Sequence, residues 1–184
     1  LYAEKNYPKD HKWNALDFKG GDLNTSIIKT HLGRTIMIQW DETSPRPYTR
    51  HNLIQGTKGI LAGFPTRVAF EGGVPGATDS HHRWAEGEQL DALYEQYEHP
   101  IYKRLGALSK KMGGHGGMDF MMLYRIVECL KKGQPLDQNV YEGCLWSAVA
   151  PLSKSSVAQG GMPQKFPDFT RGYWEQTQPL TIVS

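Results

Sequence analysis

The first third of the chain alternates apolar and polar residues with the period of two that is typical of β-strands. Segments 25–30 and 34–40 flank the pair Leu32-Gly33, which favours a tight turn. One face of the second segment is strongly apolar and is formed by Ile36, Ile38 and Trp40. The other face is only mildly so and carries Thr35, Met37 and Gln39. This pattern predicts an antiparallel hairpin with one face against helices.

Further strand patterns follow the hairpin. Segments 51–55 and 59–61 are joined by a glycine-containing turn, and 66–71 reads as another strand. Residues 72–87 are rich in turn formers and predict a long loop, a kind of segment that is often functional or mobile.

The second half of the chain changes to helical spacing. Helices are predicted over 88–98, 101–111 and 118–132, the last with Lys131 and Lys132 at its end and Gly133 as its stop. Asp137 is expected to cap a further helix that Pro151 kinks or restarts.

Strands followed by helices predict an α+β fold, an open and mainly antiparallel sheet backed by helices. We expect a single domain over 1–184, built of a connector packed through its aromatic residues (1–20), strands (21–71), a loop (72–87), helices (88–160) and an extended tail (161–184). A Rossmann domain is not expected in this chain. Its glycine-rich segment 113–117 lacks the preceding strand and the following acidic residue of a dinucleotide site.

Composition and charge narrow the function classes. The chain has 184 residues, 39% of them hydrophobic and 22% charged, as in ordinary globular domains. A net charge of +2 without a basic stripe argues against a nucleic-acid partner, and no apolar run approaches the ~20 residues of a membrane span. Cys129 and Cys144 are too few for a disulfide framework, and we expect both to be small buried side chains in helices.

The chain begins at Leu1 without a signal-like segment, so we expect it to continue a longer or processed protein. Localisation cannot be read from it, and export in a bacterium stays open.

Three segments could carry chemistry. In the first, two prolines hold Arg46 and Tyr48, a pair that suits a polyhydroxylated ligand, although a rigid corner with surface arginines is the alternative. In the second, four glycines surround His115 before a helix start, where His115 could contact a sugar hydroxyl or move a proton. Asp119 in the first turn of that helix could also act merely as a cap. The third, Ser80 to Trp84, favours a sugar-stacking lid over a metal site, because two histidines are too few ligands.

Seven segments form motifs that occur in order along the chain: Gly21 to Thr25, Leu32 to Ile36, Ser44 to Tyr48, Asn52 to Gly59, Gly113 to Phe120, Pro135 to Asp137 and Pro167 to Gly172. From about Gly20 to Trp174, these motifs resemble glycoside hydrolase family 109. Its type member is a bacterial α-N-acetylgalactosaminidase of the Gfo/Idh/MocA superfamily.

The resemblance implies chemistry that the spacing of residues does not show. A tightly held NAD oxidises the sugar at C3, the C2 proton becomes acidic, the aglycone is eliminated, water adds and the hydride returns. Tyr48 matches the sugar-contacting tyrosine of the family, and Arg46, His115 and Asp119 match other motif positions. The nucleotide-binding domain and the catalytic tyrosine are expected upstream, so the chain alone is expected to be inactive. The long loop 72–84 departs from the family pattern and leaves the preference for N-acetylgalactosamine open.

Three functions follow as hypotheses. The first is the substrate-binding domain of an NAD-dependent retaining glycosidase that takes an amino-sugar glycoside and works with its own N-terminal domain. The second is the same domain of an NAD(P)-dependent sugar oxidoreductase, for which net NADH release is the discriminator. The third is a non-catalytic glycan-binding or homo-oligomerisation module, with the sheet face of Met37 and Gln39 buried between copies.

Overall fold

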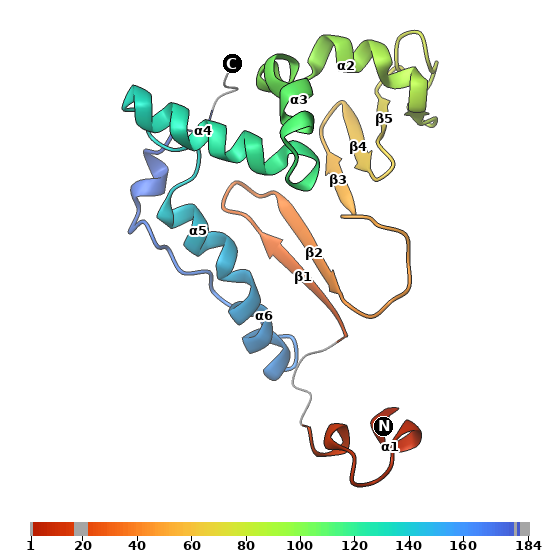
Figure 1. Ribbon diagram of the computed structural model, residues 1–184, viewed down its shortest axis with the longest axis vertical. Coiled ribbons are helices and arrows are strands. Elements are labelled where there is room, and N and C mark those ends of the chain that lie inside the picture. The colour runs from red at the N-terminus through yellow and green to blue at the C-terminus, as the bar shows by residue number, and fades with distance from the viewer. Residues whose placement is uncertain (1, 17–21, 179, 181–184) are drawn as a thin grey trace. The chain divides into compact units, whose positions relative to one another are not determined.

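The computed structural model describes residues 2–16, 22–178 and 180. Backbone contacts divide the chain into two compact units, Leu1–Pro47 and Tyr48–Ser184. The expectation of one domain over 1–184 stays a prediction. The α+β class is confirmed: the strands form open antiparallel sheets, and the longer helices come after them in the chain (Figure 1).

The first unit begins with two short helical turns, α1 (Tyr2–Asn6) and the 3-10 helix η1 (Lys12–Ala15). Their aromatic side chains pack together, as predicted. The ring of Tyr7 stacks on His11 at 4.4 Å between centroids and meets Trp13 edge-on at 4.9 Å. The helical turns themselves were not predicted, and Phe18, also expected in this cluster, lies outside the described residues.

The predicted hairpin is confirmed in the same unit. Strands β1 (Leu23–Lys29) and β2 (Thr35–Asp41) pair antiparallel, with Ile27 opposite Met37. The turn is closed by hydrogen bonds from the Thr30 amide to the Arg34 carbonyl at 2.8 Å and from the Gly33 amide to the Thr30 carbonyl at 3.0 Å. Gly33 has a φ of +80°, which only glycine adopts at little cost. Exposed apolar side chains lie on both faces of the hairpin, among them Met37 and Trp40.

The second unit begins with a separate four-stranded sheet, so the strands form two sheets where one was expected. Strands β3 (Asn52–Gln55), β4 (Gly59–Gly63) and β5 (Arg67–Phe70) agree closely with the predicted segments. Strand β6 (Ala85–Glu86) lies in the segment predicted as a loop, and pairs with the edge of β5 through Ala85 and Val68. The returning chain builds a small core under the sheet, formed by Val68, Val74, Ala85 and Leu90, with Phe70, Ala77 and Leu93 packed against it.

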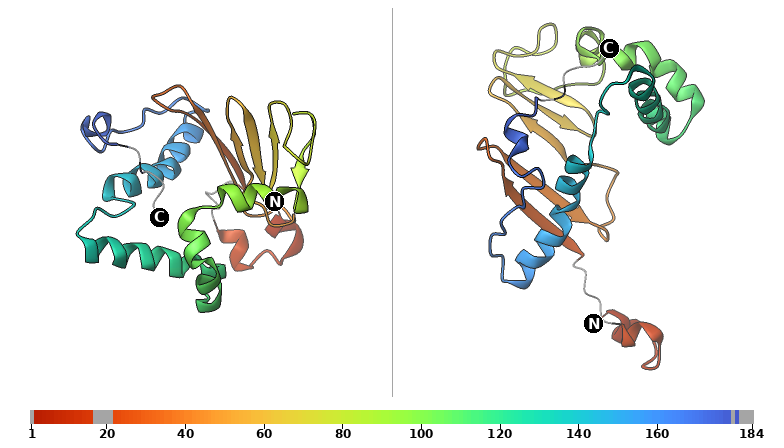
Figure 2. Two further views of the ribbon diagram at one scale, coloured as in Figure 1. Left: turned by 90° about the horizontal axis from the view of Figure 1, so that it is seen from above. Right: turned by 90° about the vertical axis from the view of Figure 1, so that its left-hand side faces the viewer.

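The helices follow in the predicted order (Figure 2). They are the 3-10 helix η2 (Gly87–Leu90), α2 (Asp91–Tyr97), α3 (Pro100–Met112), the 3-10 turn η3 (His115–Gly117), α4 (Met118–Lys132), α5 (Val140–Ser147), α6 (Val149–Ala158) and the 3-10 turn η4 (Tyr173–Glu175). Helix α4 has the predicted bounds, and Gly133 ends it in the left-handed conformation. The break between α5 and α6 places Pro151 in the first turn of α6, which confirms the predicted restart.

The predicted cap of α5 was wrong. Asn139, not Asp137, caps the helix: its Oδ1 accepts from the amides of Tyr141 and Glu142, and the Glu142 carboxylate accepts in return from the Asn139 amide. Asp137 instead accepts two hydrogen bonds from Arg125 on α4, at 2.8 and 2.7 Å. The ion pair therefore fastens the α4–α5 connection to α4, a role that the sequence did not indicate.

Candidate functional site

The glycine-rich loop between α3 and α4 has a left-handed backbone, a conformation that favours glycine. Gly113, Gly114, Gly116 and Gly117 have φ values of +79°, +71°, +69° and +102°, and His115 has +47°. Gly117 also lies against α3, because a Cβ built on it would be 2.7 Å from the Oγ of Ser109. That serine is 1% exposed and donates to the Gly106 carbonyl at 2.8 Å. Gly117 therefore allows the loop to pack closely against α3, and this contact determines the position of His115.

His115 and Asp119, two of the predicted site residues, are brought together by this loop. Nδ1 of His115 lies 3.0 Å from Oδ2 of Asp119, and the two side chains are 79% and 49% exposed. The hydrogen bond to Asp119, helped by its negative charge, raises the pKa of His115 above its usual range. With Nδ1 engaged by the carboxylate, Nε2 is the ring atom left to meet a ligand, as donor or acceptor according to pH.

We predict that the pKa of His115 falls when Asp119 is replaced by Asn. A raised pKa in the folded state means that the pair adds stability below pH ~6.5, and that this contribution is lost as pH rises through the folded value. Titration of the His115 ring protons by NMR measures the pKa directly. Asp91→Asn, which removes a carboxylate from the first turn of α2, is the control and should leave the curve unchanged. Identical titrations of wild type and Asp119→Asn would refute the pairing in solution.

Tyr48 lies in a cluster of its own at the start of the second unit. Nε of Arg50 donates to the Tyr48 hydroxyl at 2.6 Å, and the guanidinium carbon lies 5.9 Å from the centre of the Tyr48 ring. The ring of Phe64 is 5.6 Å away, between centroids. Tyr48 is 69% and Phe64 50% exposed. Tyr48 was predicted and its two partners were missed.

Arg46 belongs to the first unit, whereas Tyr48, His115 and Asp119 belong to the second. Its Nη1 is 3.4 Å from Oδ2 of Asp41, at the end of β2. Asp41 also accepts from the amides of Thr43 and Ser44 through Oδ1, and chiefly the Ser44 hydrogen bonds lower the pKa of its carboxyl. This contact supports the rigid-corner alternative for Arg46, and its role toward a sugar stays a prediction.

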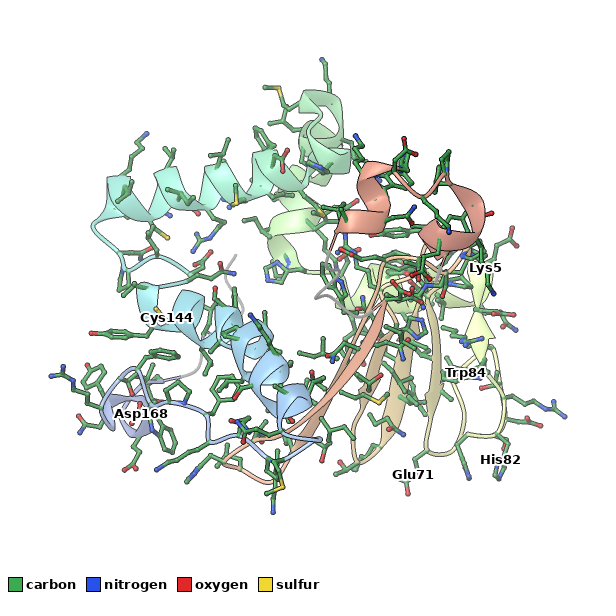
Figure 3. All side chains as sticks on the ribbon, turned by 90° about the horizontal axis from the view of Figure 1, so that it is seen from below. Lys5, Glu71, His82, Trp84, Cys144 and Asp168 are labelled. Carbon is green, nitrogen blue, oxygen red and sulfur yellow. The ribbon has the colours of Figure 1, made fainter. Side chains whose placement is uncertain are left out.

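In the loop that was expected to act as a lid, the aromatic rings already have partners within the chain. The guanidinium of Arg67 lies over the Trp84 ring, 4.9 Å from its centre, and the rings of His81 and His82 are 4.1 Å apart. Figure 3 shows where Trp84 and His82 lie on this segment. Over the described ranges, the side chains of His, Cys, Asp and Glu form no group of three that could hold a metal ion.

Asp168, in the last of the motifs, is engaged by its own loop. Its Oδ1 accepts from the amide and the hydroxyl of Thr170, at 2.9 and 2.7 Å, and its Oδ2 accepts from the Gly172 amide at 2.6 Å. The Thr170 hydroxyl hydrogen bond, with the backbone amides, lowers the pKa of this carboxyl. Figure 3 shows the residue on the loop that follows α6. This carboxylate holds a turn closed and is not poised for proton transfer.

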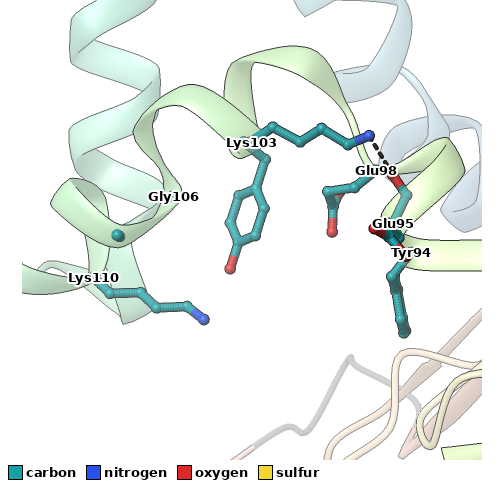
Figure 4. Close-up of a pocket in the computed structure, with 8 residues that line it drawn as sticks. Tyr94, Glu95, Glu98, Lys103, Gly106 and Lys110 are labelled. Atoms are coloured by element: carbon teal, nitrogen blue, oxygen red, sulfur yellow. Dashed lines mark hydrogen bonds between the residues drawn. The ribbon is translucent and has the colours of Figure 1, made fainter. Parts of the chain in front are cut away.

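Open hollows also occur in the second unit. One of about 650 Å³ lies along α2 and α3, where Lys103 donates to the Glu95 carbonyl and Lys110 lies 5.6 Å from the centre of the Tyr102 ring (Figure 4). A second, of about 880 Å³, is lined by the sheet and α2. Tyr48, His115 and Asp119 line neither of these two hollows, and their side chains are exposed.

Two further expectations concern the helices. Cys129 is buried as predicted, whereas Cys144 is only half-buried. Among the helices that the structure describes, none has both the length and the apolar character needed to cross a bilayer.

Comparison with known families gives the context of these residues. The profile of the family described as "Glycosyl hydrolase 109, C-terminal domain" matches residues 1–176. The chain belongs to glycosyl hydrolase family 109. The resemblance read from the motifs is thereby confirmed.

Relatives in glycosyl hydrolase family 109 are similar over the whole chain. Identity is 65% with Glycosyl hydrolase family 109 protein 1 of Akkermansia muciniphila, over 99% of this chain and 37% of that protein. It is 62% with protein 2 of the same organism, over 100% and 38%, and 53% with protein 2 of Shewanella sp. (strain ANA-3), over 99% and 39%. The chain thus spans less than two fifths of the length of these family 109 proteins.

Proposed function

We propose that this chain is the substrate-binding domain of an NAD-dependent retaining glycosidase that acts on α-N-acetylgalactosaminides by oxidation, elimination, addition and reduction. Membership of a glycosyl hydrolase family over residues 1–176 is the observation that carries the proposal. The exposed Tyr48, with its hydroxyl fixed by Arg50, and the exposed His115–Asp119 pair support it, because both suit a polyhydroxylated ligand.

The described residues of this chain do not fit an NAD site of their own. Its glycine-rich loop runs from helix α3 to helix α4, whereas the dinucleotide fingerprint runs from a strand into a helix. We therefore assign NAD to an N-terminal domain of the whole protein. The contribution of this chain is to bind and orient the sugar and to hold a proton at His115.

Within that division, the two surface groups have different tasks. Tyr48 offers a ring face and a hydroxyl to the sugar. Nε2 of His115 donates to or accepts from a sugar hydroxyl, while Asp119 holds the other side of the ring and favours the charged imidazolium. Arg46 is assigned a supporting contact with the ligand.

Self-association through the face of Met37 and Gln39 is part of the proposal, and sedimentation equilibrium of the whole protein would test it.

The test uses the whole protein with p-nitrophenyl α-N-acetylgalactosaminide, with and without NAD. We expect NAD-dependent release of nitrophenol without accumulation of NADH. Tyr48→Phe should lower kcat/KM about tenfold, the effect of one lost hydrogen bond. Tyr97→Phe is the control, because Tyr97 on α2 is just as exposed, at 71%. NADH accumulating on free sugars, without aglycone release, would instead make this the substrate domain of a sugar oxidoreductase.

A further inference from the structure

Helix α4 leaves its apolar side exposed. Five apolar residues recur three and four positions apart and so lie together on one side of the helix: Met122, Leu123, Ile126, Val127 and Leu130. We call this set the α4 stripe. Its members are between 36% and 66% exposed. Helices of folded domains ordinarily turn such a stripe toward the core.

The side of α4 opposite the stripe carries charges that already have partners. Arg125 and Glu128 are 15% and 10% exposed and pair with each other. Arg125 also bonds to Asp137, and Glu128 lies 3.9 Å from Nη2 of Arg104 on α3. The usual arrangement of an amphipathic helix, with charges in water and apolar residues buried, is thus inverted in the part of the chain that the structure describes. The charged side is packed within this chain, and the apolar side is open.

The length of the relatives indicates what covers the stripe. Apolar surface of this kind marks a protein–protein contact, and permanent contacts are the more apolar ones. Relatives at 53–65% identity are matched over 37–39% of their length, so more than half of each lies outside the matched region. The profile describes that region as a C-terminal domain, which places the remainder on its N-terminal side. A part joined to α4 by the same chain reaches it at a high effective concentration, an advantage that a second copy lacks.

We propose that the α4 stripe is the surface on which the N-terminal part of the whole protein docks. The position of α4 gives this contact a consequence for the candidate site. Asp119 holds His115 from the first turn of α4, and the stripe begins one turn later, at Met122. A part seated on the stripe therefore borders the His115–Asp119 pair, and ligand sites commonly lie between domains. That consequence rests on the proposed function, in which the N-terminal part holds NAD; the docking itself does not.

Oxidation of methionines in the whole protein tests whether the stripe is covered. Three methionines are similarly exposed in this chain: Met122 on the stripe at 57%, Met112 at the end of α3 at 63%, and Met162 after α6 at 59%. We expect dilute hydrogen peroxide to oxidise Met122 about tenfold more slowly than the two controls, because oxidation needs access to the sulfur. Peptide mass spectrometry measures the three rates in one sample. Oxidation of Met122 as fast as that of Met112 or Met162 overturns the proposal.

Photo-crosslinking of the whole protein identifies what covers the stripe. With p-benzoyl-phenylalanine in place of Leu123, we expect a product of monomer mass that joins the stripe to a peptide from before Leu1. The matched control carries the same group in place of Lys132, on the opposite side of α4, where the side chain is 56% exposed and lies beside Glu128. It should not crosslink to that segment. A product of dimer mass would assign the stripe to a second copy, and a crosslink within 1–184 would assign it to this chain itself. Either result overturns the proposal, as does the absence of a crosslink.

A charge placed on the stripe gives an independent check. Val127→Glu should raise the oxidation rate of Met122 to that of the controls, since an unpaired carboxylate is costly in an apolar contact. Val157→Glu, at a residue of α6 that is 64% exposed, should leave the rate unchanged. Protection of Met122 that survives Val127→Glu contradicts the docking surface. None of these readouts uses substrate or NAD, so failure of the glycosidase proposal and failure of this one are distinguishable.

Discussion

Alanine at position 117 is expected to destabilise the second unit by about 3 kcal/mol, through backbone strain and overpacking combined. Gly117 has a φ of +102°, where side chains are strained, and its new Cβ would lie 2.7 Å from both the carbonyl carbon and the Oγ of Ser109. Neither neighbour can yield easily. One is the backbone of α3, and the other is a buried hydroxyl that is hydrogen-bonded to the Gly106 carbonyl.

Urea unfolding of the full chain, followed by circular dichroism, measures this loss. Gly116→Ala is the matched control, since Gly116 has a φ of +69° but nothing within 4 Å of its built Cβ. It should cost about 1 kcal/mol from backbone strain alone. Equal losses in the two variants would show that the close approach of the loop to α3 does not contribute.

Replacing Arg125 by Leu is expected to cost about 2 kcal/mol, because it leaves the Asp137 carboxylate, whose side chain is only 26% exposed, without its charged partner. Arg125 is 15% exposed and bonds to both oxygens of Asp137, to Glu128 and, at 3.3 Å, to Sγ of Cys129. The substitution removes hydrogen bonds to two segments, the last turns of α4 and the connection to α5. Urea unfolding at pH 7 measures the change.

The same ion pair predicts the acid dependence of stability. The hydrogen bonds from Arg125 lower the pKa of Asp137, and Lys132 followed by Arg125 lowers the pKa of Glu128. A lowered pKa in the folded state adds stability above the unfolded value, about 3.9 for Asp, and this is lost as pH falls through the folded value. The wild type should therefore lose stability below pH ~4 more steeply than Arg125→Leu. Arg83→Leu, at a pair exposed on both sides, should behave like the wild type; parallel curves for wild type and Arg125→Leu would contradict the assigned role.

Local signals in the sequence predicted local structure well. The turn at Gly33 and both ends of α4 were predictable because the residues that set them are neighbours in sequence. Asp137 and Asn139 both precede the same helix, and only the Glu at the third helical position singles out Asn139. Strand β6 escaped prediction because two residues form no period, and its pairing with β5 alone defines it.

The contacts of the candidate site also differ in how far the sequence could predict them. His115 lies in the glycine-rich loop with a φ of +47°, before α4 begins at Met118, so its contact with Asp119 depends on the conformation of the loop and not on helical spacing. Arg50 lies two residues after Tyr48, near enough along the chain for a local contact, a signal present in the sequence but not used. Phe64 reaches Tyr48 only through the folding of β3 and β4, and no pattern along the chain indicates that contact.

The closed turn around Asp168 bears on how variants of this domain should be chosen. Both oxygens of the carboxylate are taken by hydrogen bonds from Thr170 and Gly172, so a mutational survey that finds Asp168 intolerant would be reporting on folding and not on chemistry. Asp168 occupies a motif position, but its role in the structure is to hold the turn of 168–172. Libraries meant to alter the sugar preference should therefore keep 167–172 fixed and vary the surroundings of Tyr48.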